Sequence, residues 1–248
     1  MTTAAPDTDG RVTVWDIDLA PAAAHRDACL ALLSDDERAR TSRFLRDEDR
    51  LRYAASHAAL RLVLGHRLRT DPRGLAFGTG RAGKPHLAGV WAGSCRFSLS
   101  HSGSRALVGL SASAEIGVDV EEMRPMPDLL RIARAHFAAS EIADLDSLAP
   151  DRLTPAFFAC WTRKEAVVKA TGEGLSLPLD SFSVSVSPAK AVLLSMPGGA
   201  REWSLHTLPT APGYAAALAV AAADAGFVRR ALPPDWPDRI AAPSQQGR

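Results

Sequence analysis

Apolar positions follow a helical period in several stretches of the chain, while charged residues occupy the other faces of those stretches. The predicted helices run over about 49–69, 128–137, 140–148 and 151–171. Ahead of the first of them, Ser34 and Glu37 have the spacing of a capping box. We therefore expect another helix to begin directly after Ser34.

Short runs rich in β-branched, aromatic or alternating residues predict strands between Gly, Pro and Ser positions. These runs are 12–19, 75–77, 97–100, 106–110, 116–121, 182–186, 192–194, 203–208 and 214–221. The order of strands and helices occurs twice, which is typical of an α+β protein with two lobes of similar composition. We place the N-terminal lobe at 1–113, the C-terminal lobe at 114–231 and a flexible Pro-rich tail at 232–248.

Composition excludes several classes of protein without indicating a function. The 248 residues are 46% hydrophobic and 23% charged, with a net charge of +1, which argues against a disordered, collagen-like or coiled-coil chain and indicates no nucleic-acid partner. Cys29, Cys95 and Cys160 are far apart and are expected to be reduced. The start lacks a signal-peptide pattern, and the longest apolar stretch, 214–223, is too short to span a membrane. We expect a soluble cytoplasmic protein.

The predicted strand 116–121 carries two acids. Asp119 and Glu121 are two residues apart, so their side chains lie on the same face of a strand. Two carboxylates that face the same way repel each other unless a cation lies between them or one is protonated. A Mg²⁺ site is one interpretation, because Mg²⁺ prefers oxygen ligands. A solvated edge strand is the other, and spacing alone favours it.

Three further segments combine cations, hydroxyls and turns. On the helix after Trp161, Glu165 and Lys169 are four residues apart, which suits either a surface ion pair or a metal carboxylate beside a phosphate-facing ammonium. The run 80–85 is either a plain turn or a nucleotide contact, although it is not a Walker A loop. The sequence around Ser100 and His101 lacks the Gly-x-Ser-x-Gly motif of serine hydrolases, and these two side chains suit phosphate contacts better.

Taken together, these segments resemble the 4'-phosphopantetheinyl transferases of the Sfp type. The resemblance rests on GKPHL (83–87), FSLSHSG (97–103), IGVDVE (116–121), WTRKEAVVKATGEGL (161–175) and LPLDSFSV (177–184). It implies two pseudo-twofold-related lobes, each an antiparallel sheet packed with helices, with the active site in the cleft between them. Because the homotrimeric relatives are about half as long, it also implies a pseudodimeric monomer.

The implied activity is the transfer of phosphopantetheine from coenzyme A to a serine of an apo acyl or peptidyl carrier protein, with release of 3',5'-ADP. Carriers of polyketide, nonribosomal peptide and fatty-acid synthases are the usual acceptors, which implies a place in natural product biosynthesis. The resemblance implies that Mg²⁺, or Mn²⁺, is bound by Asp119, Glu121 and Glu165. Glu165 would also be the base for the attacking hydroxyl, and Lys169 would neutralise charge on the pyrophosphate.

The same resemblance assigns the coenzyme A contacts. Ser100 and His101 would hold its phosphates, and Gly83, Lys84 and Pro85 would line the adenine, with Lys84 also near phosphate.

Basic contacts to the 3'-phosphate would come from the segment after Ser34. Arg40 and Arg52 align with basic residues of the family, and Arg43 is a weaker candidate. A solvated helix face is the alternative for Arg40 and Arg43. Glu37 stands where a relative has a basic residue, so one such contact is expected to be missing.

Other interpretations stay open at this point. The chain could be a non-catalytic coenzyme A-binding regulatory module, although the intact acids and Lys169 argue against that. It could also be another Mg²⁺-dependent phosphotransferase, although Walker and kinase motifs are absent. For the segment 126–137, with Arg131 and Arg134, we consider contact with a carrier helix and, as the more favoured alternative, an amphipathic helix packed on its own lobe.

Overall fold

The structure is a computed structural model that describes residues 12–80 and 82–241. Its strands are β1 (Val12–Asp18), β2 (Phe77–Thr79), β3 (Pro85–Leu87), β4 (Arg96–Ser102), β5 (Arg105–Ser111), β6 (Ile116–Glu122), β7 (Ser183–Val184), β8 (Leu193–Ser195), β9 (Ser204–Thr207), β10 (Tyr214–Val220) and β11 (Phe227–Ala231). Its helices are α1 (Arg26–Leu32), α2 (Asp35–Thr41), α3 (Asp47–Leu68), α4 (Leu129–His136), α5 (Ala139–Asp146), α6 (Pro150–Thr171) and α7 (Asp238–Ala241). The α+β class is confirmed.

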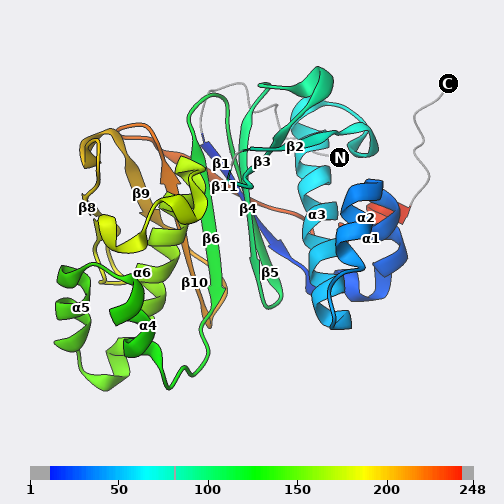
Figure 1. Ribbon diagram of the computed structural model, residues 1–248. Coiled ribbons are helices and arrows are strands. Elements are labelled where there is room, and N and C mark those ends of the chain that lie inside the picture. The colour runs from blue at the N-terminus through cyan, green and yellow to red at the C-terminus, as the bar shows by residue number, and fades with distance from the viewer. Residues whose placement is uncertain (1–11, 81, 242–248) are drawn as a thin grey trace.

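Two larger sheets form the centre of the molecule. One has the order β11-β1-β5-β4 and the other β6-β10-β9, and their strand pairs are antiparallel except for the parallel pair β1 and β11. Figure 1 shows α1, α2 and α3 on one side of these strands and α4, α5 and α6 on the other. The expected C-terminal lobe included β11, whereas β11 joins the N-terminal sheet, with Val12 opposite Phe227.

Three clusters of buried side chains explain this layering. The first packs α3 against the β1–β5–β4 face, the second packs α6 against β10, and the third lies between the two sheets. Val14 and Leu107 from one sheet and Val118 and Leu218 from the other belong to the third cluster. Because apolar burial is the main favourable term in folding, these clusters hold the layers in the order helix, sheet, sheet, helix.

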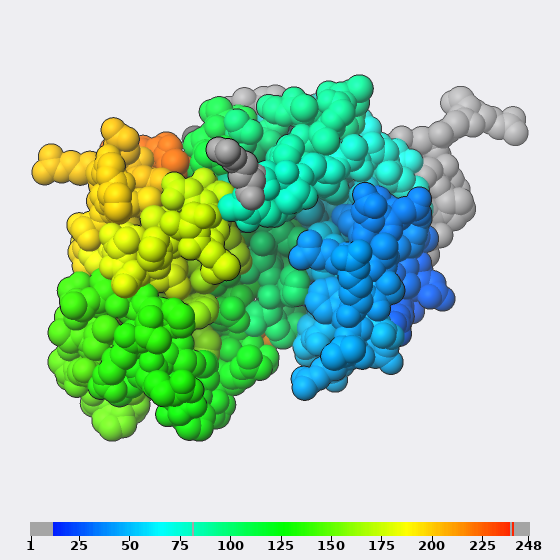
Figure 2. Space-filling model, in the orientation of Figure 1, coloured from blue at the N-terminus to red at the C-terminus, as the bar shows by residue number. Residues whose placement is uncertain are grey.

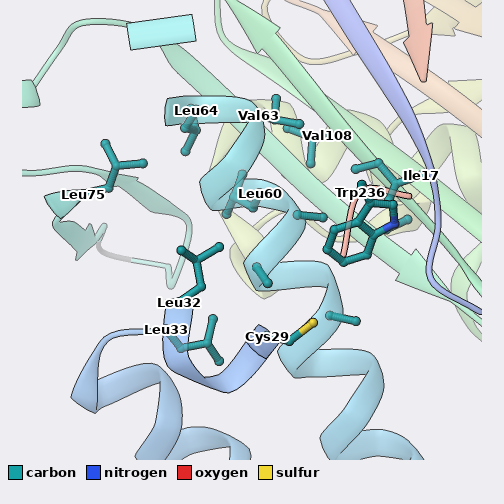
Figure 3. Packing of buried hydrophobic residues seen from close by; sticks show 14 of the residues in the cluster. Ile17, Cys29, Leu32, Leu33, Leu60, Val63, Leu64, Leu75, Val108 and Trp236 are labelled. Carbon is teal, nitrogen blue, oxygen red and sulfur yellow. The ribbon is translucent and has the colours of Figure 1, made fainter. Parts of the chain in front are cut away.

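The C-terminal segment differs from the sequence expectation. We expected flexibility from residue 232 onward, but the Trp236 side chain is only 1% exposed and belongs to the core beneath α3. Figure 3 shows its indole beside Ile17 and Val108. The indole Nε1 donates a hydrogen bond to the Asp18 carbonyl at 2.9 Å. Burial of the large apolar surface of Trp236 therefore fixes this segment on the core despite the prolines around it. Residues 242–248 of the expected tail lie outside the described part of the chain.

Local signals predicted the helices well. Ser34 and Glu37 form the expected capping box at the start of α2, with the Glu37 carboxylate accepting the Ser34 backbone N–H at 2.8 Å. The predicted helix over 49–69 is α3, which begins two residues earlier, at Asp47. No helix within residues 12–80 and 82–241 is long and apolar enough to cross a bilayer.

Candidate functional site

A glycine in β6 allows α6 to lie directly on the strand. A Cβ built at Gly117 would overlap the backbone carbonyl of Ala166 and come within 2.5 Å of the Ala170 nitrogen. Only glycine permits so close an approach of a helix backbone to a strand. The consequence is that Glu165 and Lys169, on the helix, lie beside Asp119, two residues along the strand.

Lys169 and Asp119 form the centre of the site. The Lys169 ammonium lies 2.6 Å from Asp119 Oδ1 and 2.9 Å from the Ser100 hydroxyl. Ser100 in turn donates to Asp119 Oδ1 at 2.8 Å. Burial raises the pKa of Asp119, and the positive charge of Lys169 and these hydrogen bonds oppose the rise. Asp119 Oδ2 is buried without a hydrogen-bond partner among the described residues.

The other two predicted metal carboxylates lie in the same charged environment. Burial and the negative charge of Asp119 raise the pKa values of both Glu121 and Glu165. Glu121 also accepts a hydrogen bond from the Ser102 hydroxyl at 2.7 Å. In residues 12–80 and 82–241, no group of three His, Cys, Asp or Glu side chains is arranged to hold a metal ion. The donor chemistry still fits a hard cation, because the acids repel one another and Asp119 Oδ2 has no hydrogen-bond partner in the described part of the chain.

A cavity of about 770 Å³ opens beside this cluster. Gly83, Lys84 and Pro85 line one wall, and Glu165 and Lys169 of α6 line another. The remaining lining includes Trp161, His136 and the residues of the segment after α6: Gly172, Gly174, Leu175, Leu177, Pro178, Leu179 and Asp180. Figure 2 shows the surface hollowed between the blue α2 and α3 region and the yellow segment that follows α6. The cavity thus joins segments from both halves of the chain.

Lys84 lines the cavity, and its ammonium is bound to groups of the protein itself. Its ammonium donates to Glu115 at 2.7 Å, to the Ile116 carbonyl at 3.2 Å and to the Ala170 carbonyl at 3.0 Å. These three bonds use the three N–H donors of the ammonium. In this structure Lys84 ties the 80–85 segment to β6 and α6, and a phosphate contact would require one of these bonds to break.

Ser100 likewise has its hydroxyl turned inward. The residue is only 6% exposed, and its hydroxyl contacts Asp119, Lys169 and the Val120 backbone N–H. Its geometry orients the Asp119 carboxylate, and the phosphate contact remains a prediction.

His101 lies in a positively charged environment on the surface. Although its side chain is partly exposed, the surrounding protein restricts hydration of the imidazole, and the charges of His57, Lys169 and Arg52 add to this effect. Together they lower the pKa of His101 to about 4. The imidazole is therefore neutral near pH 7, in a field that favours anions.

The arginines predicted to contact the 3'-phosphate belong to the same region. Arg40 on α2 lies 5.9 Å from the centre of the Tyr53 ring, and Tyr53 stacks on His57 with the ring centres 4.0 Å apart. Arg52 is paired with Glu48 at 3.3 Å and with Asp49 at 3.4 Å. Arg40 and Arg43 are both exposed.

Glu37, at the position where a relative has a basic residue, faces inward. It accepts hydrogen bonds from His57 at 3.1 Å and from Arg61 at 2.8 Å. Burial would raise the pKa of Glu37, but the hydrogen bonds from His57, Ser34 and Arg61 outweigh burial and lower it to about 2. The acid therefore stabilises the packing of α2 on α3, while Arg40 and Arg43 stay exposed on the surface.

Ser102 is the residue that sequence reasoning missed. Its hydroxyl accepts the Glu122 backbone N–H at 3.1 Å and donates to Glu121. The alternation of Ser98, Ser100 and Ser102 places all three on one face of a strand, and this spacing was the available signal.

Comparison with known proteins points in one direction. A model of the 4'-phosphopantetheinyl transferase superfamily matches residues 115–219. A Bacillus subtilis protein named 4'-phosphopantetheinyl transferase is 34% identical over 205 residues, which cover 83% of this chain and 88% of its own. The 4'-phosphopantetheinyl transferase HetI of a Nostoc species is 36% identical over 211 residues, 85% of this chain and 87% of its own. The 4'-phosphopantetheinyl transferase Sfp of Bacillus subtilis strain 168 is 32% identical over 195 residues, 79% of this chain and 85% of its own.

Proposed function

The chain belongs to the 4'-phosphopantetheinyl transferase superfamily and is an enzyme of that class, and from this premise we propose its donor, its metal and its acceptors. Coenzyme A is the donor, Mg²⁺ or Mn²⁺ is the metal, and the acceptors are apo acyl or peptidyl carrier proteins. The carriers belong to polyketide, nonribosomal peptide or fatty-acid synthases. The enzyme works in the cytoplasm as a monomer whose two halves act as a pseudodimer.

The observation that supports this proposal best is the position of Asp119. The residue is buried, and its carboxylate has an unpartnered Oδ2 among the described residues and touches the ammonium of Lys169, which lines the cavity. Burial of a carboxylate oxygen costs free energy unless a cation or a hydrogen-bond donor contacts it. Asp119, Glu121 and Glu165 would hold the metal. When bound, that ion would reduce the negative charge that an incoming nucleophile meets at the pyrophosphate.

The reaction moves the phosphopantetheine group between two oxygens. The serine oxygen of the carrier forms a bond to the phosphorus that bears the pantetheine arm, and the bond from that phosphorus to the 3',5'-ADP oxygen breaks. Glu165, at the cavity wall, takes the proton of the serine hydroxyl. Lys169 lies on the same wall one helical turn away and stabilises the charge on the departing 3',5'-ADP. Positioning of the two substrates supplies much of the remaining acceleration.

Coenzyme A lies across the cavity in this proposal. The backbone of Gly83 and the apolar side-chain atoms of Lys84 and Pro85 line its adenine, in agreement with the position of these residues on the cavity wall. Its phosphates lie towards Ser100, His101 and Lys169. Arg40 and Arg52 attract the 3'-phosphate. The pKa of His101 is lowered first by burial and then by the positive charges of His57, Lys169 and Arg52, which also favour an anion nearby.

We propose that the carrier protein contacts α4, and this contact can be tested. Leu129 and Ala133 are buried against the C-terminal core, as expected for an amphipathic helix packed on its own half. The other face carries Arg131 and Arg134, which are exposed and paired with Asp128 at 2.9 Å and with Asp146 at 2.8 Å. A carrier with an acidic surface would compete with Asp128 and Asp146 for these exposed arginines. An unchanged KM for the carrier after reversal of both charges would exclude this contact.

Product identity tests the reaction class. The chain is incubated with coenzyme A, Mg²⁺ and an apo carrier protein, and the small molecules are separated by chromatography. The proposal predicts one 3',5'-ADP for each carrier modified, and none without the carrier. Binding of coenzyme A without release of 3',5'-ADP would instead support a non-catalytic module, and consumption of ATP would support a different phosphotransferase.

A further inference from the structure

Serine hydroxyls join two strands that belong to different sheets. β4 is at the edge of one sheet and β6 at the edge of the other. The backbone N–H groups of Val118, Val120 and Glu122 in β6 donate to the hydroxyls of Ser98, Ser100 and Ser102 in β4, at 3.1, 3.4 and 3.1 Å. We name Ser98, Ser100 and Ser102 the serine ladder. Side-chain oxygens here accept bonds that carbonyls accept in an ordinary sheet.

Two members of the serine ladder make a second bond. Ser100 donates its proton to Asp119, and Ser102 donates its proton to Glu121 Oε2 at 2.7 Å. A hydroxyl has one proton to donate and can accept at the same time. Each of these serines therefore links the backbone of β6 to a carboxylate of the same strand. Ser98 has no carboxylate partner in the described part of the chain.

Ser102 is the cleaner case of the two. The Ser100 hydroxyl also accepts from Lys169, so a change there would disturb several groups of the site. The Ser102 hydroxyl contacts Glu121 and the next backbone N–H, and this pair of bonds fixes the carboxylate relative to the strand. Near the same end of β4, the Tyr214 hydroxyl accepts the Ser104 backbone N–H at 3.1 Å, which ties the β4–β5 turn to β10.

We propose that Ser102 is a positioning residue that orients the Glu121 carboxylate for a divalent cation, while Ser98, which also lines the cavity, joins the two sheets without bonding to a carboxylate of the described residues. This inference rests on the proposed function, because it takes Glu121 as a metal ligand. The physical reason is that a carboxylate fixed by a hydrogen bond has fewer orientations to lose when the metal binds. Loss of the Ser102 hydroxyl should therefore reduce the free energy of metal binding by more than it reduces the free energy of unfolding.

The test compares Ser102→Ala with Ser98→Ala, because each variant removes one rung of the serine ladder and only the first removes a donor to a carboxylate. Mg²⁺ alone is titrated into each full-length chain by calorimetry, and thermal unfolding is recorded without metal. We expect similar decreases in Tm for both variants, whereas Ser102→Ala raises the Kd for Mg²⁺ about tenfold relative to Ser98→Ala.

Two results would overturn the positioning role: an unchanged Kd in Ser102→Ala, or an equal rise in both variants. A wild-type chain that binds no Mg²⁺ would contradict the metal site and this inference together. The proposed function fails separately, if wild-type protein transfers no phosphopantetheine to a carrier. An active wild-type enzyme with a Kd that is insensitive to Ser102→Ala would contradict the positioning role alone.

Discussion

The Lys169 ammonium lies 2.6 Å from Asp119 Oδ1, so an ion pair joins the last turns of α6 to the middle of β6 at the edge of the cavity. The Asp119 side chain is 3% exposed and the Lys169 side chain 31% exposed, which leaves the ammonium accessible from the cavity while the acid is enclosed. In the proposed reaction, the Lys169 ammonium would contact both the Asp119 carboxylate and a phosphate of coenzyme A.

Asp119→Ala should lower transfer by about 100-fold or more, because it removes a carboxylate that we propose as a metal ligand and that contacts the Lys169 ammonium. The fold should survive, since the partly exposed Lys169 can turn towards water. Initial rates of carrier modification and thermal unfolding measure the two effects. Glu122→Ala is the matched control, an exposed acid on the opposite face of the same strand. An Asp119→Ala enzyme with near wild-type turnover would contradict the role of this carboxylate.

Gly117→Ala should destabilise the protein by at least about 1–3 kcal/mol, the usual cost of inserting an extra methyl group into a packed interior. The added Cβ would meet the backbone of α6 at Ala166 and Ala170, which cannot move as a flexible side chain can. Urea denaturation gives the free energy of unfolding. Gly226→Ala is the control, because a Cβ at Gly226 meets nothing within 4 Å. Equal stabilities of the two variants would show that α6 does not lie this close to β6.

Glu37 should contribute to stability in a pH-dependent way. Its folded pKa of about 2 lies below the ordinary value of 4.5, so its contribution is complete above pH 4.5 and is lost as the pH falls towards 2. Glu37→Gln should therefore cost about 3 kcal/mol near pH 7 and much less near pH 2. Denaturant unfolding over this pH range measures the difference. Asp36→Asn, an exposed neighbour, should show a much smaller effect, and a pH-independent cost for Glu37→Gln would refute the assignment.

Trp236→Ala should cost about 3–5 kcal/mol, the usual range for loss of a large buried side chain. Trp236→Phe is the matched variant, because it keeps an aromatic ring but removes the indole N–H that donates to Asp18. This second change should cost less, with about 1 kcal/mol attributable to the lost hydrogen bond. Thermal or denaturant unfolding gives both values. A Trp236→Ala protein as stable as the wild type would mean that the C-terminal segment does not pack on the core.

Much of the fold could be predicted from the spacing of residues that are close together in the sequence. The capping box at Ser34 and Glu37 depends on neighbouring residues, and so does the common face of Asp119 and Glu121 on β6. Such features follow from helix and strand periods. The three partners of Lys84 do not, because Ala170 is 86 residues away.

Long-range pairings escaped the sequence analysis for the same reason. β11 pairs with β1 although the two lie at opposite ends of the chain, and no local pattern specifies that partner. The role of Ser102 depends on β4 lying against β6, which belongs to a different sheet. Trp236 shows the same limit, since its burial depends on a pocket built by α3, β1 and β5.

Intact-protein mass spectrometry of an apo carrier protein tests the central claim most directly. The carrier is incubated with this chain, coenzyme A and Mg²⁺, with a parallel sample containing EDTA. We predict that the carrier gains the mass of one phosphopantetheine group and that EDTA prevents the gain. No gain on peptide-synthetase, polyketide and fatty-acid carriers would contradict the proposed acceptors, and a gain that persists in EDTA would contradict the role of the metal.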